Sequence, residues 1–420
     1  MAGMSQSSAT ASMAQKPVPQ PSYILRGHNA QVHAATFMQQ NSRLLTGDAG
    51  GWVVVWNLAI KRPVAVWKAH SNSILGIAAW GDDKVLTHGR DNRLNAWTFP
   101  AGTTEERPAL STTLPIDDSV SERPRPKLLH SLDVSTLNFC SFATCQSGHQ
   151  KATDSQPPSH SLGDTSTSSE DEILVAVPGI QDGMINVTAL PSERRVATLP
   201  PLATKASPSD DAPVRSVAAD GNGAGMVMAI GLHFHKERLQ VLAGYENGEV
   251  ALWHHESRTK SWTAIYRSKP HSQPVLSLDY ASDRDVWFTS SADAIIARHP
   301  LNPYGDTVEK AMQTRHAGQQ SLHLRRDGHI FATAGWDGKV RVYSVTSLNE
   351  LAVLKWHKEG CYAVAFADIL HPDGHDQGDA VGAVTKRQLT VAQQREEKTR
   401  MTHWIAVGSK DGKVSLWDIY

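Results

Sequence analysis

A short turn followed at a fixed distance by a closing residue recurs along this chain. The closing residue stands six positions after the turn residue in seven places, namely Gly50 to Trp56, Asp91 to Trp97, Asp182 to Thr188, Asn247 to Trp253, Asp293 to His299, Asp337 to Tyr343 and Asp411 to Trp417. The intervening residues alternate or run apolar, as in GKVRVY and GKVSLW, which is typical of a hairpin leading into a strand. Seven registers that agree predict an all-β fold, a seven-bladed β-propeller built from units of about four short strands.

A histidine opens most of these units. His28, His70, His271, His316 and His357 each precede a turn, and the first four stand 27 or 28 positions before a closing residue. Tryptophan is also frequent, with 12 residues against 8 tyrosines and 8 phenylalanines. These features resemble the WD-repeat family, whose units start with a GH-type pair and end with a WD-type pair. The resemblance covers most of residues 23–420.

The resemblance implies a hydrogen-bonded network in each unit, which runs from the closing Trp through a Ser or Thr hydroxyl and a His to the turn Asp. It carries over completely to one unit only, with the set His357, Ser409, Asp411 and Trp417. In the second unit Gly89 stands where the hydroxyl is expected. In the sixth unit, which has His316 and Asp337, Gly335 and Tyr343 replace the hydroxyl and the Trp.

The last unit has too few residues for its fourth strand, because only three residues follow Trp417. An unpaired strand edge would then be exposed in a ring that otherwise buries its edges. We therefore expect the segment Tyr23–Arg26, which precedes the first His, to pair with the C-terminal strand and close the ring.

The rest of the chain is expected to add length rather than a second domain. Residues 1–21 are rich in Ser, Ala, Gln and Pro and predict a disordered tail before one propeller over 22–420. Insertions are expected at about 101–127, 146–171, 201–224 and 368–402, of which 146–171 and 201–224 are predicted to be polar, solvated loops. The last contains KRQLTVAQQREEKTR, whose helix-forming residues allow a short surface helix. It could be a partner site, but long insertions cost little entropy, which favours merely tolerated length.

Composition argues against several classes of protein. A formal net charge of −1 disfavours a large basic surface for direct nucleic-acid or membrane binding. With no long apolar run and no hydrophobic leader, we expect neither a membrane span nor secretion by a signal peptide. The three cysteines, Cys140, Cys145 and Cys361, form no CxxC pair, which favours a reduced intracellular compartment.

Residues that could catalyse a reaction or bind a metal do not occur at the spacings that such sites require. No HExxH or GxSxG is present, and pairs such as His254-His255 have no companion ligands at metal spacing. We predict no catalytic, cofactor-binding or metal-binding residues, so the expected function is binding by the surface. The candidate partner-binding turn face consists of the residues before the turn Asp or Asn: Arg90, Glu246, Trp336 and Lys410. An exposed Trp336 could be an interaction anchor or could pack under a neighbouring loop.

Several longer segments are more specific than the repeat. VLTHGRDNRLNAW, VLAGYENGEVALW, FATAGWDGKVRVY and the terminal VGSKDGKVSLWDIY resemble the fungal ASTRA-associated family and its animal G-protein β-subunit-like relatives. This resemblance implies a non-enzymatic scaffold in the nuclear ASTRA complex, with roles in chromatin remodelling and in maturation of phosphatidylinositol-3-kinase-related kinases. It also implies protein partners, a monomeric propeller within a hetero-complex, and a location in the nucleus or also the cytoplasm. The alternative is another WD-repeat adaptor, such as a ubiquitin-ligase substrate receptor or a trafficking scaffold.

Overall fold

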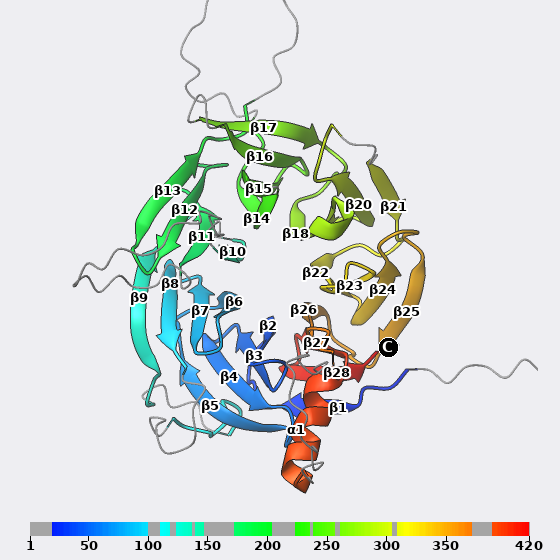
Figure 1. The fold of residues 1–420 in the computed structure, drawn as a ribbon. Helices are drawn as coiled ribbons and strands as arrows, with labels where there is room; N and C mark the ends of the chain where they lie inside the picture. The colour runs from blue at the N-terminus through cyan, green and yellow to red at the C-terminus, as the bar shows by residue number, and fades with distance from the viewer. Residues whose placement is uncertain are drawn as a thin grey trace, which may run out of the picture.

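Seven four-stranded antiparallel sheets surround a central axis in this computed structural model (Figure 1). The structure describes residues 19–99, 110–117, 123–136, 139–146, 172–203, 223–235, 238–256, 261–304, 309–371 and 389–419. The predicted all-β seven-bladed propeller is confirmed. Most of the expected tail 1–21 and of the insertions 146–171 and 201–224 lies outside the described residues, so those boundaries stay predictions.

Each blade follows the chain from the channel outwards. Blade 1 comprises β2 (Val32–Met38), β3 (Arg43–Asp48), β4 (Trp52–Asn57) and β5 (Arg62–Lys68). Blade 2 comprises β6 (Ile74–Trp80), β7 (Lys84–Gly89), β8 (Arg93–Thr98) and β9 (Lys127–Asp133). Blade 3 comprises β10 (Ala143–Gln146), β11 (Ile173–Pro178), β12 (Ile185–Leu190) and β13 (Arg194–Leu199). Blades 4 and 5 comprise β14 (Val227–His235), β15 (Arg238–Tyr245), β16 (Val250–Glu256) and β17 (Ser261–Ser268); and β18 (Val275–Ala281), β19 (Val286–Ser291), β20 (Ile295–Pro300) and β21 (Lys310–Gln313), with the short 3-10 helix η2 (Ser282–Arg284). Blade 6 comprises β22 (Gln319–Leu324), β23 (Ile330–Gly335), β24 (Lys339–Ser344) and β25 (Glu350–Lys355).

Blade 7 joins the two ends of the described chain. It contains β26 (Cys361–Phe366), β27 (Trp404–Ser409) and β28 (Lys413–Asp418), and its outer strand is β1 (Tyr23–Arg26). β1 pairs with β28 in antiparallel register from Tyr23 opposite Leu416 to Arg26 opposite Lys413. Leu25 of β1 is 1% exposed and packs into the core shared by blades 7 and 1. The predicted ring closure is therefore confirmed.

The core lies between neighbouring blades, where the inner faces of adjacent sheets meet. Between blades 1 and 2, for example, Trp67 and Trp97 meet edge to face with ring centroids 6.2 Å apart. All four closing Trp residues are buried, as the six-residue interval requires. Burying side chains of this size contributes roughly 1.5–3 kcal/mol each, so the ring is stabilised mainly by contacts between blades.

The third blade has the shortest innermost strand of the described blades. β10 begins only at Ala143 and has four residues. Phe142, just before it, is buried and contacts the core between blades 2 and 3. The later strands of this blade lie where the alternation predicts them.

Two insertions fold back on the propeller. In the first, residues 110–117 lie along the outer strand of blade 1, where the Val66 N–H donates to the Ser111 carbonyl at 2.7 Å. In the last, the expected short helix is α1 (Val391–Met401), which a capping box at Thr390 begins. Asn41, 1% exposed, donates to the carbonyls of Asp368 and Arg400 and so holds both ends of that insertion to blade 1.

Candidate functional site

The turn face is the end of the propeller formed by the turns between the second and third strand of each blade and by the loops that enter each first strand. The structure places the four predicted residues at equivalent positions on this face. Their backbone N–H groups donate to the loop before the first strand of the same blade: Arg90 to Ser73 (2.8 Å), Glu246 to Met226 (2.9 Å), Trp336 to Gly318 (2.9 Å) and Lys410 to Gly360 (2.8 Å). The side chains therefore project from backbone that is fixed at each blade.

Trp336 combines the two roles that the sequence left open. Its indole N–H donates to Gln320 Oε1 at 2.9 Å, and its ring lies directly over Gly318. A Cβ on Gly318, whose φ is +75°, would come within 2.1 Å of a ring carbon, so only glycine fits there. The side chain is nevertheless 46% exposed. One side of the indole is packed and the other is available to a partner.

Other apolar side chains reach solvent on the same face. Phe139, in the loop before β10, is 44% exposed and lies 5.0 Å from the Arg90 guanidinium. Ile180, in the turn between β11 and β12, is 77% exposed. These residues belong to the side of the ring opposite blade 6, as the places of β10, β11 and β23 in Figure 1 show. The turn face thus carries apolar groups on both sides of the channel mouth.

Six blades have a bulge at the start of the first strand, which no local residue pattern predicts. In six blades the register with the second strand shifts at the second residue of the first strand, at His33, Leu75, Met228, Leu276, Gln320 and Tyr362. Bulges of this kind redirect a side chain out of the sheet. Gln320 accordingly reaches Trp336, and the rings of His33 and Tyr362 meet between blades 1 and 7 with centroids 5.6 Å apart.

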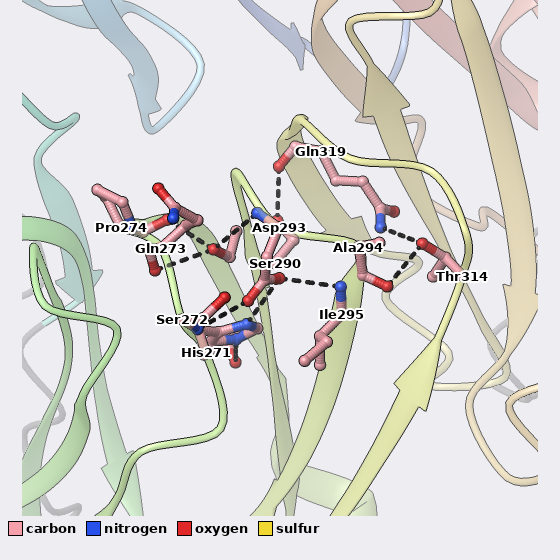
Figure 2. Close-up of polar contacts among 12 residues, drawn as sticks. His271, Ser272, Gln273, Pro274, Ser290, Asp293, Ala294, Ile295, Thr314 and Gln319 are labelled. Carbon is pink, nitrogen blue, oxygen red and sulfur yellow. Dashed lines mark hydrogen bonds and ion pairs between the residues drawn. The ribbon is translucent and has the colours of Figure 1, made fainter.

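Polar contacts fix the turns of the face. In blade 5 the Asp293 carboxylate accepts hydrogen bonds from the His271 ring and from the backbone N–H groups of Ser272 and Ile295 (Figure 2). The Ser290 hydroxyl donates to the Gln319 carbonyl at 3.0 Å and so ties blade 5 to blade 6. Buried polar groups that are fully paired make such turns rigid.

The network expected in blade 7 needs two corrections. Ser409 contacts neither His357 nor Trp417; its hydroxyl donates to the Gly360 carbonyl at 3.1 Å. Ser415 supplies the hydroxyl instead, since it accepts the Trp417 indole N–H at 2.8 Å and lies 2.8 Å from His357 Nε2. The hydrogen bond from His357 to Asp411 is also missing, because His357 Nδ1 lies 3.8 Å from the Asp411 carboxylate. Lys413 Nζ binds that carboxylate instead, at 2.6 Å.

Complete networks occur where the sequence did not predict them. In blade 2, Thr87 takes the place assigned to Gly89, and it binds both His70 Nε2 (2.8 Å) and the Trp97 indole N–H (2.9 Å). Blade 1 has the same arrangement, with the set His28, Asp48, Thr46 and Trp56. Blade 5 has it with His271, Asp293, Thr289 and His299 as the closing residue. Each hydroxyl comes from the middle of the second strand, whereas Ser415 stands on the third strand opposite Val407.

Blade 6 replaces the histidine. His316 takes no part in a network, and the buried guanidinium of Arg341 binds the Asp337 carboxylate at 2.7 Å in its place. An Arg–carboxylate pair with two hydrogen bonds can hold a turn as well as a His does. Blade 6 therefore differs from the expected network in the residue that binds Asp337, while its turn is still held.

Charge states on the turn face follow from these contacts. Burial alone would raise the pKa of Asp91, but hydrogen bonds from His70 and Ser71 outweigh it and lower the pKa below the usual value. Burial lowers the pKa of His357 to about 4 and of His299 to about 3. Asp91 is therefore ionised and these two histidines are neutral at pH 7.

The described residues offer little for chemistry. Among them, no three His, Cys, Asp or Glu side chains gather at metal-binding geometry. Within the same part of the chain, no helix is both long and apolar enough to cross a bilayer. The arrangement that the structure does provide is a rigid face with exposed aromatic, apolar and charged groups.

Comparison with known proteins agrees with the fold and specifies the family. The model of the WD domain, G-beta repeat, matches residues 19–57, 310–344 and 400–418. ASTRA-associated protein 1 of Verticillium alfalfae is 44% identical, over 96% of this chain and 93% of that protein. Proteins of the same name from Aspergillus niger and Schizosaccharomyces pombe are 40% and 30% identical, over 98% and 96% of this chain and the full length of each relative. The chain therefore belongs to the ASTRA-associated protein 1 family of WD-repeat β-propellers.

Proposed function

We propose that this protein is a non-enzymatic scaffold subunit of an ASTRA-type assembly and that it binds its protein partners through the turn face. The observation that carries the proposal is the exposure of Trp336, Phe139 and Ile180 on one face, where a hydrogen bond to the Gly318 carbonyl fixes the backbone of Trp336. Exposed aromatic groups on a rigid support are typical of binding hot spots. The names of the relatives support the choice of assembly.

The cellular role follows from that membership. The assembly acts in the nucleus, in chromatin remodelling and in maturation of phosphatidylinositol-3-kinase-related kinases, and the propeller enters it as a monomer. Imaging of the tagged chain in living cells tests the location. A signal confined to the cytoplasm would refute the nuclear role.

The test of the binding face is affinity purification of the tagged chain, followed by mass spectrometry, for the wild type and for Trp336→Ala. Loss of an aromatic anchor costs about 2 kcal/mol, close to thirtyfold in affinity, so the recovery of partners should fall strongly. Ile60→Ala is the matched control, because Ile60 is 56% exposed but lies in the turn between β4 and β5 at the other end of the propeller. Circular dichroism confirms that each variant is folded.

Two results would count against the proposal. Equal recovery of partners by folded Trp336→Ala and by the wild type would remove the turn face around Trp336 as the site. Recovery of a ubiquitin-ligase adaptor or of trafficking proteins, without chromatin or kinase-maturation subunits, would select the alternative adaptor function.

A further inference from the structure

A groove of about 540 Å³ lies on the side of the propeller between blades 1 and 2. Its walls are the end of β5, the loop into β6, and the strands β8 and β9. Trp97 and Ala69 lie deep in it, and Lys68, Arg93 and Arg125 stand at its edges. The groove meets the turn face at Ser71 and Asp91, but its lining does not include Trp336, Phe139 or Ile180, on which the proposed function depends.

The equivalent groove one blade earlier is already filled, by residues 110–117 of the first insertion. Leu114 packs against Trp56 and within 2.6 Å of where a Cβ of Gly27 would stand. The segment also forms backbone hydrogen bonds on both sides, from Val66 N–H to the Ser111 carbonyl (2.7 Å) and from Ile116 N–H to the Gly27 carbonyl (3.0 Å). Residues 110–114 lie beside the outer strand of the blade, and residues 115–117 form a turn.

The strand register makes the two grooves equivalent. Trp56 and Trp97 are the closing residues of their blades, and Gly27 and Ala69 each precede the network histidine. Val66 pairs with Val54, two residues before Trp56, as Ser131 pairs with Asn95, two residues before Trp97. Ser131 on β9 therefore stands where Val66 binds the inserted segment.

The two grooves differ in charge. Blade 1 has Trp52 and Val54 where blade 2 has Arg93 and Asn95. Arg125 forms no ion pair with any residue that the structure describes, and the pair of Arg93 with Asp133 (3.3 Å) is weak because Asp133 is 85% exposed. The one carboxylate in the lining, Asp91, is held by His70 and Ser71. Among the described residues, the lining therefore carries three cationic side chains and one carboxylate that is already paired.

We propose that this groove binds an extended, acidic segment of a partner protein. The segment lies along β9 as residues 110–117 lie along β5, and its carboxylates face Lys68, Arg93 and Arg125. One small apolar residue sits on Trp97, because the methyl group of Ala69 occupies space that Leu114 uses beside Gly27. Addition of a strand to an exposed edge supplies the backbone hydrogen bonds, and the charges supply selectivity.

The probe is a fluorescein-labelled peptide, Asp-Glu-Asp-Val-Asp-Glu-Asp, whose binding to the full chain is followed by fluorescence anisotropy. We expect saturable binding that weakens as NaCl is added. The double variant Lys68→Glu/Arg125→Glu reverses two of the three charges and should weaken binding roughly tenfold or more. The matched control is Lys355→Glu, since Lys355 ends β25 as Lys68 ends β5, and it should bind as the wild type does.

A second peptide, with every acid replaced by its amide, should not bind, and a third, with Val moved to one end, should bind more weakly. The proposal is overturned if no binding occurs up to about 1 mM peptide, if the double variant binds like the wild type, or if Lys355→Glu loses as much. Recovery of partners by affinity purification of the same double variant is a separate readout. If the double variant recovers its partners normally, a negative result of the peptide assay refutes only the groove proposal and not binding by the turn face.

Discussion

The two serines of blade 7 allow a direct test of which hydroxyl belongs to the network. Ser409 and Ser415 are both fully buried, and each can be changed to alanine with the loss of a single atom. Ser415→Ala leaves the Trp417 indole N–H and His357 Nε2 without a partner. His357 Nδ1 already has no hydrogen bond in the part of the chain that the structure describes. The His357 imidazole would thus lose its last hydrogen bond.

The expected losses differ because the remaining partners differ. An unsatisfied buried polar group costs about 1–3 kcal/mol, so Ser415→Ala should lower the free energy of unfolding by about 2–4 kcal/mol. Ser409→Ala removes the hydrogen bond to the Gly360 carbonyl and two long ones, to the Glu359 carbonyl and from the Asp411 N–H (3.5 Å each). The Gly360 carbonyl keeps the Lys410 N–H at 2.8 Å. Ser409→Ala should therefore lower the free energy of unfolding by about 0.5–1.5 kcal/mol.

The assay is urea unfolding of both variants and the wild type, followed by tryptophan fluorescence and by circular dichroism. The two signals must coincide and the slopes must agree before the midpoints are converted to free energies. Equal losses for the two serines, or a larger loss for Ser409→Ala, would refute the assignment of Ser415.

Three further expectations concern stability. Deletion of residues 1–26 removes β1 and should lower the melting temperature strongly, whereas deletion of 1–20 should change it little; equal melting would contradict ring closure. The pKa values of His357 (about 4) and His299 (about 3) in the folded protein lie below the usual 6.5, so the unfolded chain binds more protons between these values. The free energy of unfolding should therefore fall as the pH drops from about 6.5 towards 4 and stay level above pH 6.5. Urea midpoints across this pH range measure it. Asn41→Ala should release α1, and faster hydrogen exchange over residues 391–401 with unchanged exchange in β14 to β17 would show it.

The turn spacing predicted the fold because a hairpin is local. Six residues from turn to closing Trp fix one strand and its direction, and seven such intervals fix the number of blades. The same reasoning located β1, since a strand edge without a partner requires one. The bulges at residues such as Gln320 escaped prediction because no local residue pattern marks them, and their side-chain contacts, such as that of Gln320 with Trp336, join separate segments of the chain.

The choice of Ser409 failed for a related reason. Distance along the chain cannot tell which of two paired strands faces the histidine, and only the pairing of Val407 with Ser415 reveals that the hydroxyl lies on the third strand. The sequence predicted an insertion at 101–127 without any contact for it, yet Leu114 packs against the core that contains Trp56. That contact joins segments far apart in the chain, for which this sequence has no local pattern.

The pairing of β1 with β28 also decides how the ring responds to tension. The chain enters β1 at Tyr23, opposite Leu416, close to where β28 ends. A pull on these two flanking segments would load the backbone pairs one after another, as a zipper opens, and not all together in shear. We expect blade 7 to peel open at low force in an optical trap, while the other blades, each continuous in the chain, stay closed. A partner that clamps β1 onto β28 would therefore act as a mechanical lock.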